Sequence, residues 1–226
     1  MWDRVVDGRV LRFHLAGLNH QNLLMSDEET GSWWQQVSGE CILGPLKGRR
    51  LRRISSDEVT LESWRGEHPE STVVRFDPGH LADYPPSDWE PRITRLTGPH
   101  ELIVGIELDG ASAAWPLAKL RDQSPLNAQV GRTPILLIVG ADGNSVRSFV
   151  RPSVEGKPLE FYRRPAAASL IDSATGSSWN FAGQATAGPL AGRLLDAVQN
   201  TKDYWFDWRR YHPGTLLHSG GALVHE

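Results

Sequence analysis

The chain contains the same stretch of sequence twice, and this duplication constrains its architecture more than any other feature. The segment DEETGSWWQQVSGECILGPLKGRRL begins at Asp27, and the related segment DSATGSSWNFAGQATAGPLAGRLL begins at Asp172. The similarity continues forward into SWRGEHP and DWRRYHP, which begin at Ser63 and Asp207. It also extends backward into VDGRVLRF and VEGKPLEF. An internal repeat of this kind predicts two homologous halves.

The two halves do not begin alike. Residues 101–150, which read as hairpin material, precede the second copy, whereas only Met1–Val5 precede the first. If the halves are structurally equivalent, the first half lacks its opening hairpin. Two explanations fit this difference: a first half that is reduced in nature, or a gene that starts upstream of Met1.

Short-range signals predict a mainly β fold with short helices, a β-rich α+β class. Asp-Gly pairs at residues 7–8, 109–110 and 142–143 each separate short apolar or alternating stretches, which is typical of tight β-hairpins. Short helices are expected around Leu61 and Trp64, around Trp205 and Trp208, and in PLAKLRDQ.

The chain is therefore expected to divide into 1–78, a proline-rich connection at 79–97, and 98–226. We expect the two halves to form one globular unit. The nine tryptophans favour a tryptophan-lined core, with a stacking surface for flat ligands as the alternative.

Composition excludes several classes of protein. The formal net charge of −3 gives no reason to expect a nucleic-acid partner. The longest apolar run, ILLIVG from Ile135, has the length of a buried strand and is too short to span a membrane. Cys41 is the only cysteine, so the chain cannot form an internal disulfide. The first residues show neither the basic n-region nor the apolar h-region of a signal peptide, and we expect the N-terminus to be incomplete.

Several long phrases resemble the bacterial domain of unknown function 3179 family. They are DGRVLRF, LLMSDEETGSWWQQVSGECILGPLKGRRL and ESWRGEHPES in the first half, and VGIELDGASAAWPLAKL, TGSSWNFAGQATAGPLAGRLL and YWFDWRRYHP in the second. The resemblance implies a bacterial or archaeal origin and often an exported location, periplasmic or extracellular. It implies no established activity, and therefore no catalytic residues.

The chain departs from this family's pattern in two places. Family members usually carry a Cys-Pro-Leu-Cys-Gly phrase just before the segment that opens this chain, and here it is missing. The family also tends to have a histidine in the aromatic segment where this chain reads NTKDYWFDW. The resemblance suggests that the paired cysteines of the full-length family could hold a transition metal. This chain lacks those cysteines as ligands.

Two repeated motifs carry groups capable of chemistry. The DxxTGS phrases place Asp27 near Ser32, and Asp172 near Ser177. Such phrases are good turn builders, because short side chains bond to nearby backbone amides; the alternative is a cation or sugar site. His68 and His212 are equivalent positions, which predicts that each packs at the end of a short helix or, alternatively, serves as a ligand or acid–base group.

The differences between the halves are the better guide to a ligand site. The first half is longer between Phe13 and Asp27, and it has two adjacent tryptophans where the second reads SSWNF. Amides, imidazoles and indoles together are typical of small-ligand or carbohydrate sites. The candidate ligand-binding residues are His20, Asn22, Asp27, Trp33, Trp34 and Gln35.

The leading interpretation is a non-catalytic binding or structural domain, whose partner is a small ligand or a protein. The alternative is a metal-binding protein for copper, zinc or iron whose cysteine-containing segment is missing. His14, His20 and Met25 are the candidate ligands that remain, and Cys41 could supply a further soft ligand. A hydrolase is the third interpretation, although neither Ser32 nor its counterpart lies in a nucleophile-elbow motif.

Overall fold

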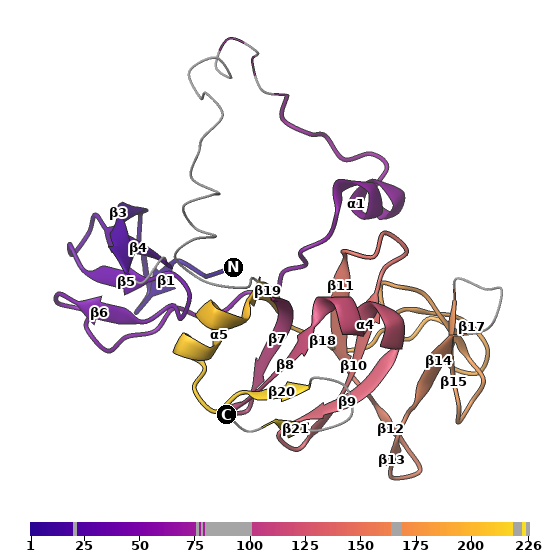
Figure 1. Ribbon diagram of the computed structural model, residues 1–226. Helices are drawn as coiled ribbons and strands as arrows, with labels where there is room; N and C mark the ends of the chain where they lie inside the picture. Colours follow the sequence, from indigo (N-terminus) through magenta and orange to yellow (C-terminus); the bar gives the residue numbers. More distant parts are fainter. Residues whose placement is uncertain are drawn as a thin grey trace. The chain divides into compact units, whose positions relative to one another are not determined.

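The computed structural model describes residues 1–19, 22–75, 77, 79, 101–163, 169–218 and 223–224. The chain divides into two compact units, Met1–Ser56 and Asp57–Glu226, and Figure 1 shows both with colours that follow the sequence. The boundary precedes Asp57, so the segment around helix α1 belongs with the second unit. The expected division into 1–78, 79–97 and 98–226 stays a prediction, because nearly all of the connection lies outside the described residues.

The first unit is a small antiparallel β-structure. Its hairpin β1–β2 turns at Asp7 and Gly8, whose φ angles of 49° and 78° are those that the Asp-Gly pair predicts. The remaining strands form one sheet in the order β3-β4-β5-β6, and its buried core contains Leu11, Trp34 and Cys41. The strands are β1 (Val5–Val6), β2 (Arg9–Val10), β3 (Phe13–Asn19), β4 (Asn22–Asp27), β5 (Trp33–Gln35) and β6 (Cys41–Leu43).

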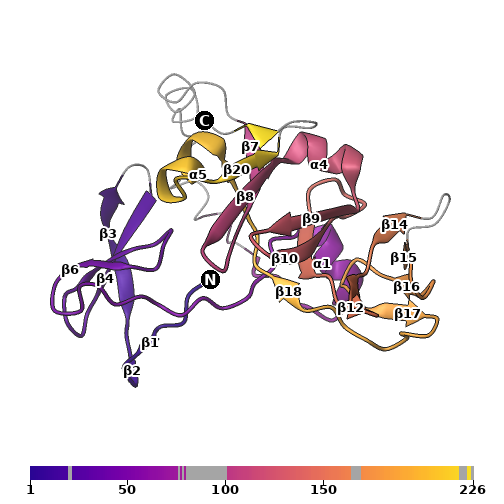
Figure 2. The ribbon, with the colours of Figure 1, turned by 90° about the horizontal axis from the view of Figure 1, so that it is seen from below.

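The second unit contains three larger sheets. Their strand orders are β19-β7-β8-β20-β21, β18-β11-β10-β9 and β14-β15-β16-β17, with the separate hairpin β12–β13. Among the described strands of this unit, all pairings are antiparallel except that of β20 with β8. Figure 2 shows these strands from below. The strands are β7 (Leu102–Leu108), β8 (Ala111–Pro116), β9 (Leu126–Val130), β10 (Thr133–Val139), β11 (Val146–Val150), β12 (Ser153–Val154), β13 (Lys157–Pro158), β14 (Phe161–Arg163), β15 (Leu170–Asp172), β16 (Ser178–Trp179), β17 (Ala185–Ala187), β18 (Ala197–Val198), β19 (Thr201–Tyr204), β20 (Leu216–His218) and β21 (Leu223–Val224).

Strand β10 lies between the two main cores of the second unit. Ile135 and Leu137 belong to the core shared with β7, β8 and α4, whereas Leu136 and Ile138 belong to the core shared with the β14–β17 sheet. Successive side chains of a strand point to opposite faces, so a strand buried on both faces must be apolar throughout. This explains the run ILLIVG, which the sequence predicts to be a buried strand.

The helices of the described residues are α1 (Leu61–Glu67), α4 (Leu117–Gln123) and α5 (Trp205–Tyr211). All three lie where the sequence predicts them. The side chain of Thr60 caps α1 by accepting a hydrogen bond from the backbone amide of Ser63. The predicted fold class, mainly β with short helices, is therefore confirmed.

The two repeated segments fold alike locally. In the first, the backbone amide of Gly48 donates to the carbonyl of Cys41 over 2.8 Å; in the second, Gly192 donates to Ala185 over the same distance. In each copy the turn between the two bonded residues contains a glycine with positive φ: Gly44 at 99° in the first and Gly188 at 91° in the second. The copies thus share a backbone pattern, and their origin by duplication stays a prediction.

Candidate functional site

Asp27 is the centre of a buried hydrogen-bond network in the first unit. Its carboxylate accepts from the indole nitrogen of Trp34 over 2.8 Å and from the amide of Thr30 over 2.6 Å. The Thr30 hydroxyl also donates to this carboxylate and lies 2.6 Å from the buried hydroxyl of Ser32. Burial alone would raise the pKa of Asp27, but the hydrogen bonds from Trp34 and Thr30 outweigh it and hold that pKa below its usual value.

The second copy contains the same network. Asp172 accepts from the indole nitrogen of Trp179 over 3.0 Å and from the amide of Thr175 over 2.6 Å. Ser177 is buried, and its hydroxyl accepts from the backbone amide of Leu190 over 3.0 Å. Each network ties a tight turn to a core tryptophan, as the turn-building interpretation of DxxTGS predicts.

The other members of the predicted ligand group are not all on one face. Trp33 is exposed and pairs with Leu43, whereas its neighbour Trp34 is buried, so the two indoles point to opposite faces of the sheet. Gln35 is buried and accepts a hydrogen bond from the side-chain amide of Asn19 over 3.0 Å. Asn22 pairs with Asn19 at the end of the β3–β4 ladder. In the structure, Asp27 is therefore hydrogen-bonded to Trp34, and Gln35 is hydrogen-bonded to Asn19.

The predicted metal ligands are divided in the same way. His14 pairs with Ser26 across the β3–β4 ladder, and Met25 is the next residue along β4, so His14 and Met25 point to opposite faces. His20, which was predicted as both a ligand-binding and a metal-ligating residue, lies outside the described residues. Among the residues that the structure does describe, no three His, Cys, Asp or Glu side chains are grouped as metal ligands. Metal binding stays a prediction.

Cys41 is a buried core residue. Burial raises the pKa of its thiol, and its Sγ lies 3.4 Å from the carbonyl oxygen of Leu43. A raised pKa disfavours the thiolate, which is the form that reacts or binds a metal. In the second copy Ala185 occupies the corresponding core position.

Helix α5 ends in a compact aromatic module. Trp208 stacks on His212 with ring centroids 3.9 Å apart, and its indole nitrogen donates to the hydroxyl of Thr215 over 3.0 Å. The module lies directly on β7, because a Cβ added to Gly105 would stand 2.6 Å from the indole. His212 Nδ1 is 3.6 Å from a carboxylate oxygen of Glu107 on the same strand. The stacking of His212 on Trp208 is the packing at the end of a short helix that the sequence predicts.

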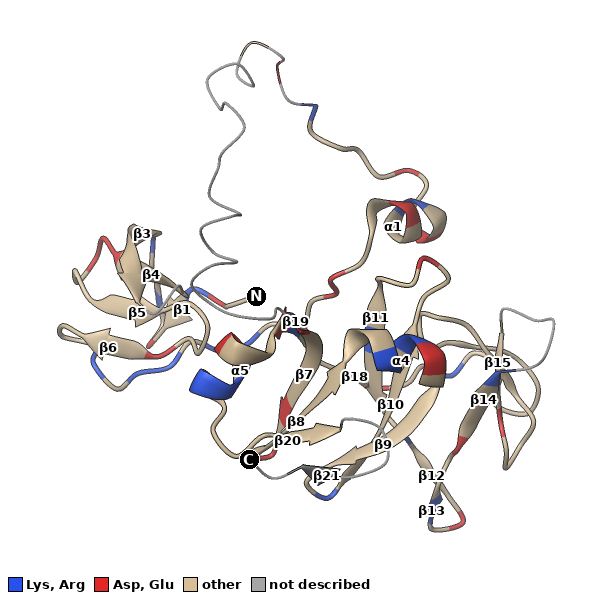
Figure 3. Cartoon of the chain, in the orientation of Figure 1, with Lys and Arg blue, Asp and Glu red and all other residues tan. Residues whose placement is uncertain are grey.

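Helix α1 is fixed to the rest of the second unit by a polar clamp that no sequence motif indicates. The guanidinium of Arg147 is buried and donates to both carboxylate oxygens of Glu67, at 2.6 and 2.7 Å, and to Asp57 at 2.7 Å. Burial would lower the pKa of Arg147, but these carboxylates outweigh it and raise that pKa. Charged residues along α1 are visible in Figure 3.

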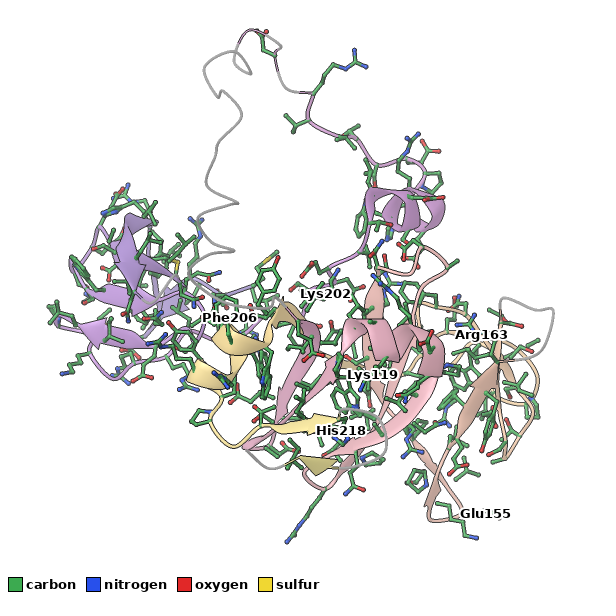
Figure 4. All side chains as sticks on the ribbon, viewed as in Figure 1. Lys119, Glu155, Arg163, Lys202, Phe206 and His218 are labelled. Carbon is green, nitrogen blue, oxygen red and sulfur yellow. The ribbon has the colours of Figure 1, made fainter. Side chains whose placement is uncertain are left out.

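A second part of the clamp is built around Asp142. Its carboxylate accepts hydrogen bonds from the hydroxyls of Thr60, Ser63 and Ser145, and these bonds outweigh burial to hold the pKa of Asp142 well below its usual range. Lys202, labelled in Figure 4, lies 3.0 Å from Glu58 just before the helix. The start of α1 is therefore held by several charge-assisted hydrogen bonds.

Asp203 is a carboxylate whose environment disfavours its charge. Burial is the largest cause and raises its pKa to about 6, with a further increase from nearby Asp207. The backbone amide of Tyr204 donates to this carboxylate over 2.7 Å and partly compensates. A carboxylate that titrates near neutral pH is often functional, although structural burial produces the same shift.

A shallow cavity of about 610 Å³ lies beside the β12–β13 hairpin. Its lining includes both cations and carboxylates: Arg151, Lys157, Glu155 and Glu160. Figure 4 labels Glu155 at the tip of this hairpin. The guanidinium of Arg151 already donates to two backbone carbonyls, those of Leu159 and Ala128. The mixed charges of the lining favour no single class of ligand.

The β3–β4 hairpin carries an exposed row of apolar side chains, here called the leucine row: Leu15, Leu18 and Leu23, with exposed fractions of 65%, 69% and 44%. Leu15 pairs with Met25, and Leu18 pairs with Leu23. Because Leu23 and Met25 alternate along β4, the row lies on the face where Met25 packs against the core. In the sequence, the polar residues of this longer hairpin stand out, whereas its leucines form a row only through the strand pairing.

The chain belongs to a family of proteins of unknown function: the family model described as Protein of unknown function (DUF3179) matches residues 1–215. This membership confirms the resemblance seen in the sequence. No curated protein and no solved structure matches the chain. Within the described residues, no helix is both long and apolar enough to cross a membrane.

Proposed function

We propose that the protein is a non-catalytic binding protein that takes up an extended strand of a partner protein beside strand β3. The observation that carries this proposal is the leucine row, which continues the apolar face of the first unit beyond its buried core. A contiguous exposed apolar surface rimmed by polar residues is typical of an interaction site. Arg12 and Glu29, which form an ion pair at 3.0 Å next to β3, provide such a rim.

Strand β3 is suited to strand addition. It is the terminal strand in the order β3-β4-β5-β6, so among the described strands it has a neighbour on one side alone. A partner strand that pairs with an exposed edge gains main-chain hydrogen bonds, and its alternate side chains gain apolar contacts. Burial of the leucine row would contribute roughly 3 to 5 kcal/mol before the cost of association. Main-chain pairing is therefore needed for a stable complex.

The leucine row indicates which side chains such a strand would carry. Leu15 and Leu18 of β3 lie on the same face, because their partners Met25 and Leu23 alternate along β4. A strand that pairs with β3 presents every second side chain to that face. We therefore expect a partner strand with aliphatic residues at alternating positions.

The buried acids and hydroxyls support a non-catalytic role. Asp27 and Asp172 accept hydrogen bonds from core indoles, and Ser32 and Ser177 bond to the threonines of their own turns. Groups engaged in this way stabilise the fold, because removing one partner leaves a buried polar atom unsatisfied.

Site-specific photo-crosslinking in the native host tests this proposal. A benzophenone amino acid at position 18 is expected to capture one discrete protein partner, and the same group at exposed Lys47 serves as the matched control. Replacing Leu15 and Leu23 with serine should abolish capture at position 18 and leave folding intact, because both side chains are exposed. Equal capture at positions 18 and 47, or capture that survives the serine substitutions, would overturn the proposal.

A further inference from the structure

Helix α1 carries the same aromatic module as α5, but it is much less covered. Trp64 packs against His68 with ring centroids 4.1 Å apart and ring planes tilted by 36°, and its indole nitrogen donates to the hydroxyl of Ser71 over 2.9 Å. These contacts repeat the indole–imidazole contact and the hydrogen bond of the α5 module, with the rings more tilted than in α5. Yet Trp64 is 40% exposed, whereas Trp208 of α5 is 3% exposed.

The difference in burial comes from the strands that cover α5. Gly105 on β7 allows the indole of Trp208 to lie directly on the strand, and Glu107 on β7 approaches His212 at 3.6 Å. On the paired strand β8, the hydroxyl of Ser112 is 2.8 Å from that of Thr215. Glu107 and Ser112 are direct partners across the β7–β8 ladder. Three residues of the β7–β8 hairpin thus each face one group of the α5 module: Gly105 faces Trp208, Glu107 faces His212, and Ser112 faces Thr215.

Within the described part of the chain, the outward face of α1 is left uncovered by the way the helix is held. Ser63 and Glu67, which are spaced i and i+4, point to the clamp formed by Asp142 and Arg147. Leu61, spaced three residues before Trp64, is likewise exposed. The helix is therefore fixed on one side and presents Leu61 and the aromatic module on the other.

We propose that this face of α1, formed by Leu61, Trp64 and His68, is a docking site for a β-hairpin of a partner protein with the chemistry of β7–β8. The hairpin carries a glycine opposite Trp64, a carboxylate two residues later for His68, and a hydroxyl on the paired strand for Ser71. The occupant is specified by the β7–β8 hairpin itself, which covers the equivalent module of α5. This site does not depend on the leucine row of the first unit.

A synthetic hairpin with the sequence of residues 102–116, closed by a disulfide between added terminal cysteines, is the probe. Closure fixes the bound conformation in advance and lowers the entropic cost of docking. The matched control hairpin carries Gly105→Val, because a side chain at this position blocks approach of the indole. The readout is the rate at which Trp64 of the intact protein is oxidised by hydroxyl radicals, resolved by mass spectrometry, with exposed Trp33 as the internal reference.

At a glycine-hairpin concentration about four times its Kd, the site is about 80% occupied, so oxidation of Trp64 should slow about fivefold while that of Trp33 is unchanged. The valine hairpin should have little effect at the same concentration. The Trp64→Ala protein should fail to bind the labelled hairpin in an anisotropy titration. Unchanged oxidation of Trp64, equal protection by both hairpins, or equal binding by the alanine variant would overturn the proposal.

Discussion

The contact between Gly105 and Trp208 allows a quantitative test of how α5 is held on β7. In Gly105→Ala the new Cβ would lie 2.6 Å from three atoms of the indole, closer than real Cβ atoms come to a neighbour. The indole cannot withdraw easily, because it is buried, stacks on His212 and donates to Thr215. Overpacking of this kind typically costs about 1 to 3 kcal/mol. Alanine by itself is favoured over glycine in a strand by roughly 0.5 to 1 kcal/mol. The difference between the two figures runs from about 0 to 2.5 kcal/mol, and we expect a net loss near its centre, about 1 kcal/mol.

Urea denaturation followed by circular dichroism measures this loss, and Gly66→Ala in α1 is the matched control. A Cβ at Gly66 meets open space and the residue is helical, so the control should stabilise α1 by up to about 1 kcal/mol. Trp208→Phe removes part of the clash, so a double-mutant cycle with Gly105→Ala should show a coupling of at least about 0.5 kcal/mol. A Gly105→Ala protein as stable as the wild type, with no coupling to position 208, would refute the packing of α5 on β7.

Two carboxylates give further predictions. Burial raises the pKa of Asp203 to about 6, so its contribution to stability is full below its unfolded pKa, about 4, and is lost as the pH rises through 6. Asp203→Asn should therefore stabilise the protein at pH 7 by about 1 to 2 kcal/mol, after allowance for partial exposure, and have little effect at pH 4. Urea titrations at the two pH values measure this difference. An equal gain in stability at both pH values would contradict the prediction. Asp27→Asn should cost about 2 to 3 kcal/mol, because an amide nitrogen would face the indole of Trp34 or the donors of Thr30. The exposed Asp7→Asn is its control and should change stability by less than about 0.5 kcal/mol in the same titration, so equal losses would refute the buried network.

Local features of the fold were predictable because their causes are local. The Asp7–Gly8 turn depends on two adjacent residues that tolerate positive φ. Helix α1 begins at a threonine cap, and the helical segment ends directly before His68, as the following Pro69 predicts. The short helices and most hairpins therefore follow from residues a few positions apart.

The clamp on α1 was not predictable in this way. Arg147 bonds to Glu67 and Asp57, which lie eighty and ninety residues earlier in the chain. In the sequence these are ordinary charged residues with no distinctive spacing, and their partnership depends on how distant strands fold together. The same holds for Asp142, whose Asp-Gly turn was predicted, whereas its bonds to Thr60 and Ser63 were not. The leucine row was missed because strand pairing, and not composition, places its members on one face.

The comparison of the two copies separates what the fold requires from what a partner could use. The Asp-Thr-Ser-Trp network is buried and complete in both, at Asp27 and at Asp172, because each copy needs it to close the same turn on its own core. A group that is needed twice for folding is a poor candidate for a function performed once. Trp64 is different: its local contacts match those of Trp208, yet only Trp208 is covered by strands of the described chain. The local sequence determines the tryptophan–histidine contact, whereas long-range packing determines how far that contact is buried. Because β7 and β8 cover the contact in α5, their residues specify which residues we propose for a partner hairpin that covers the exposed contact in α1.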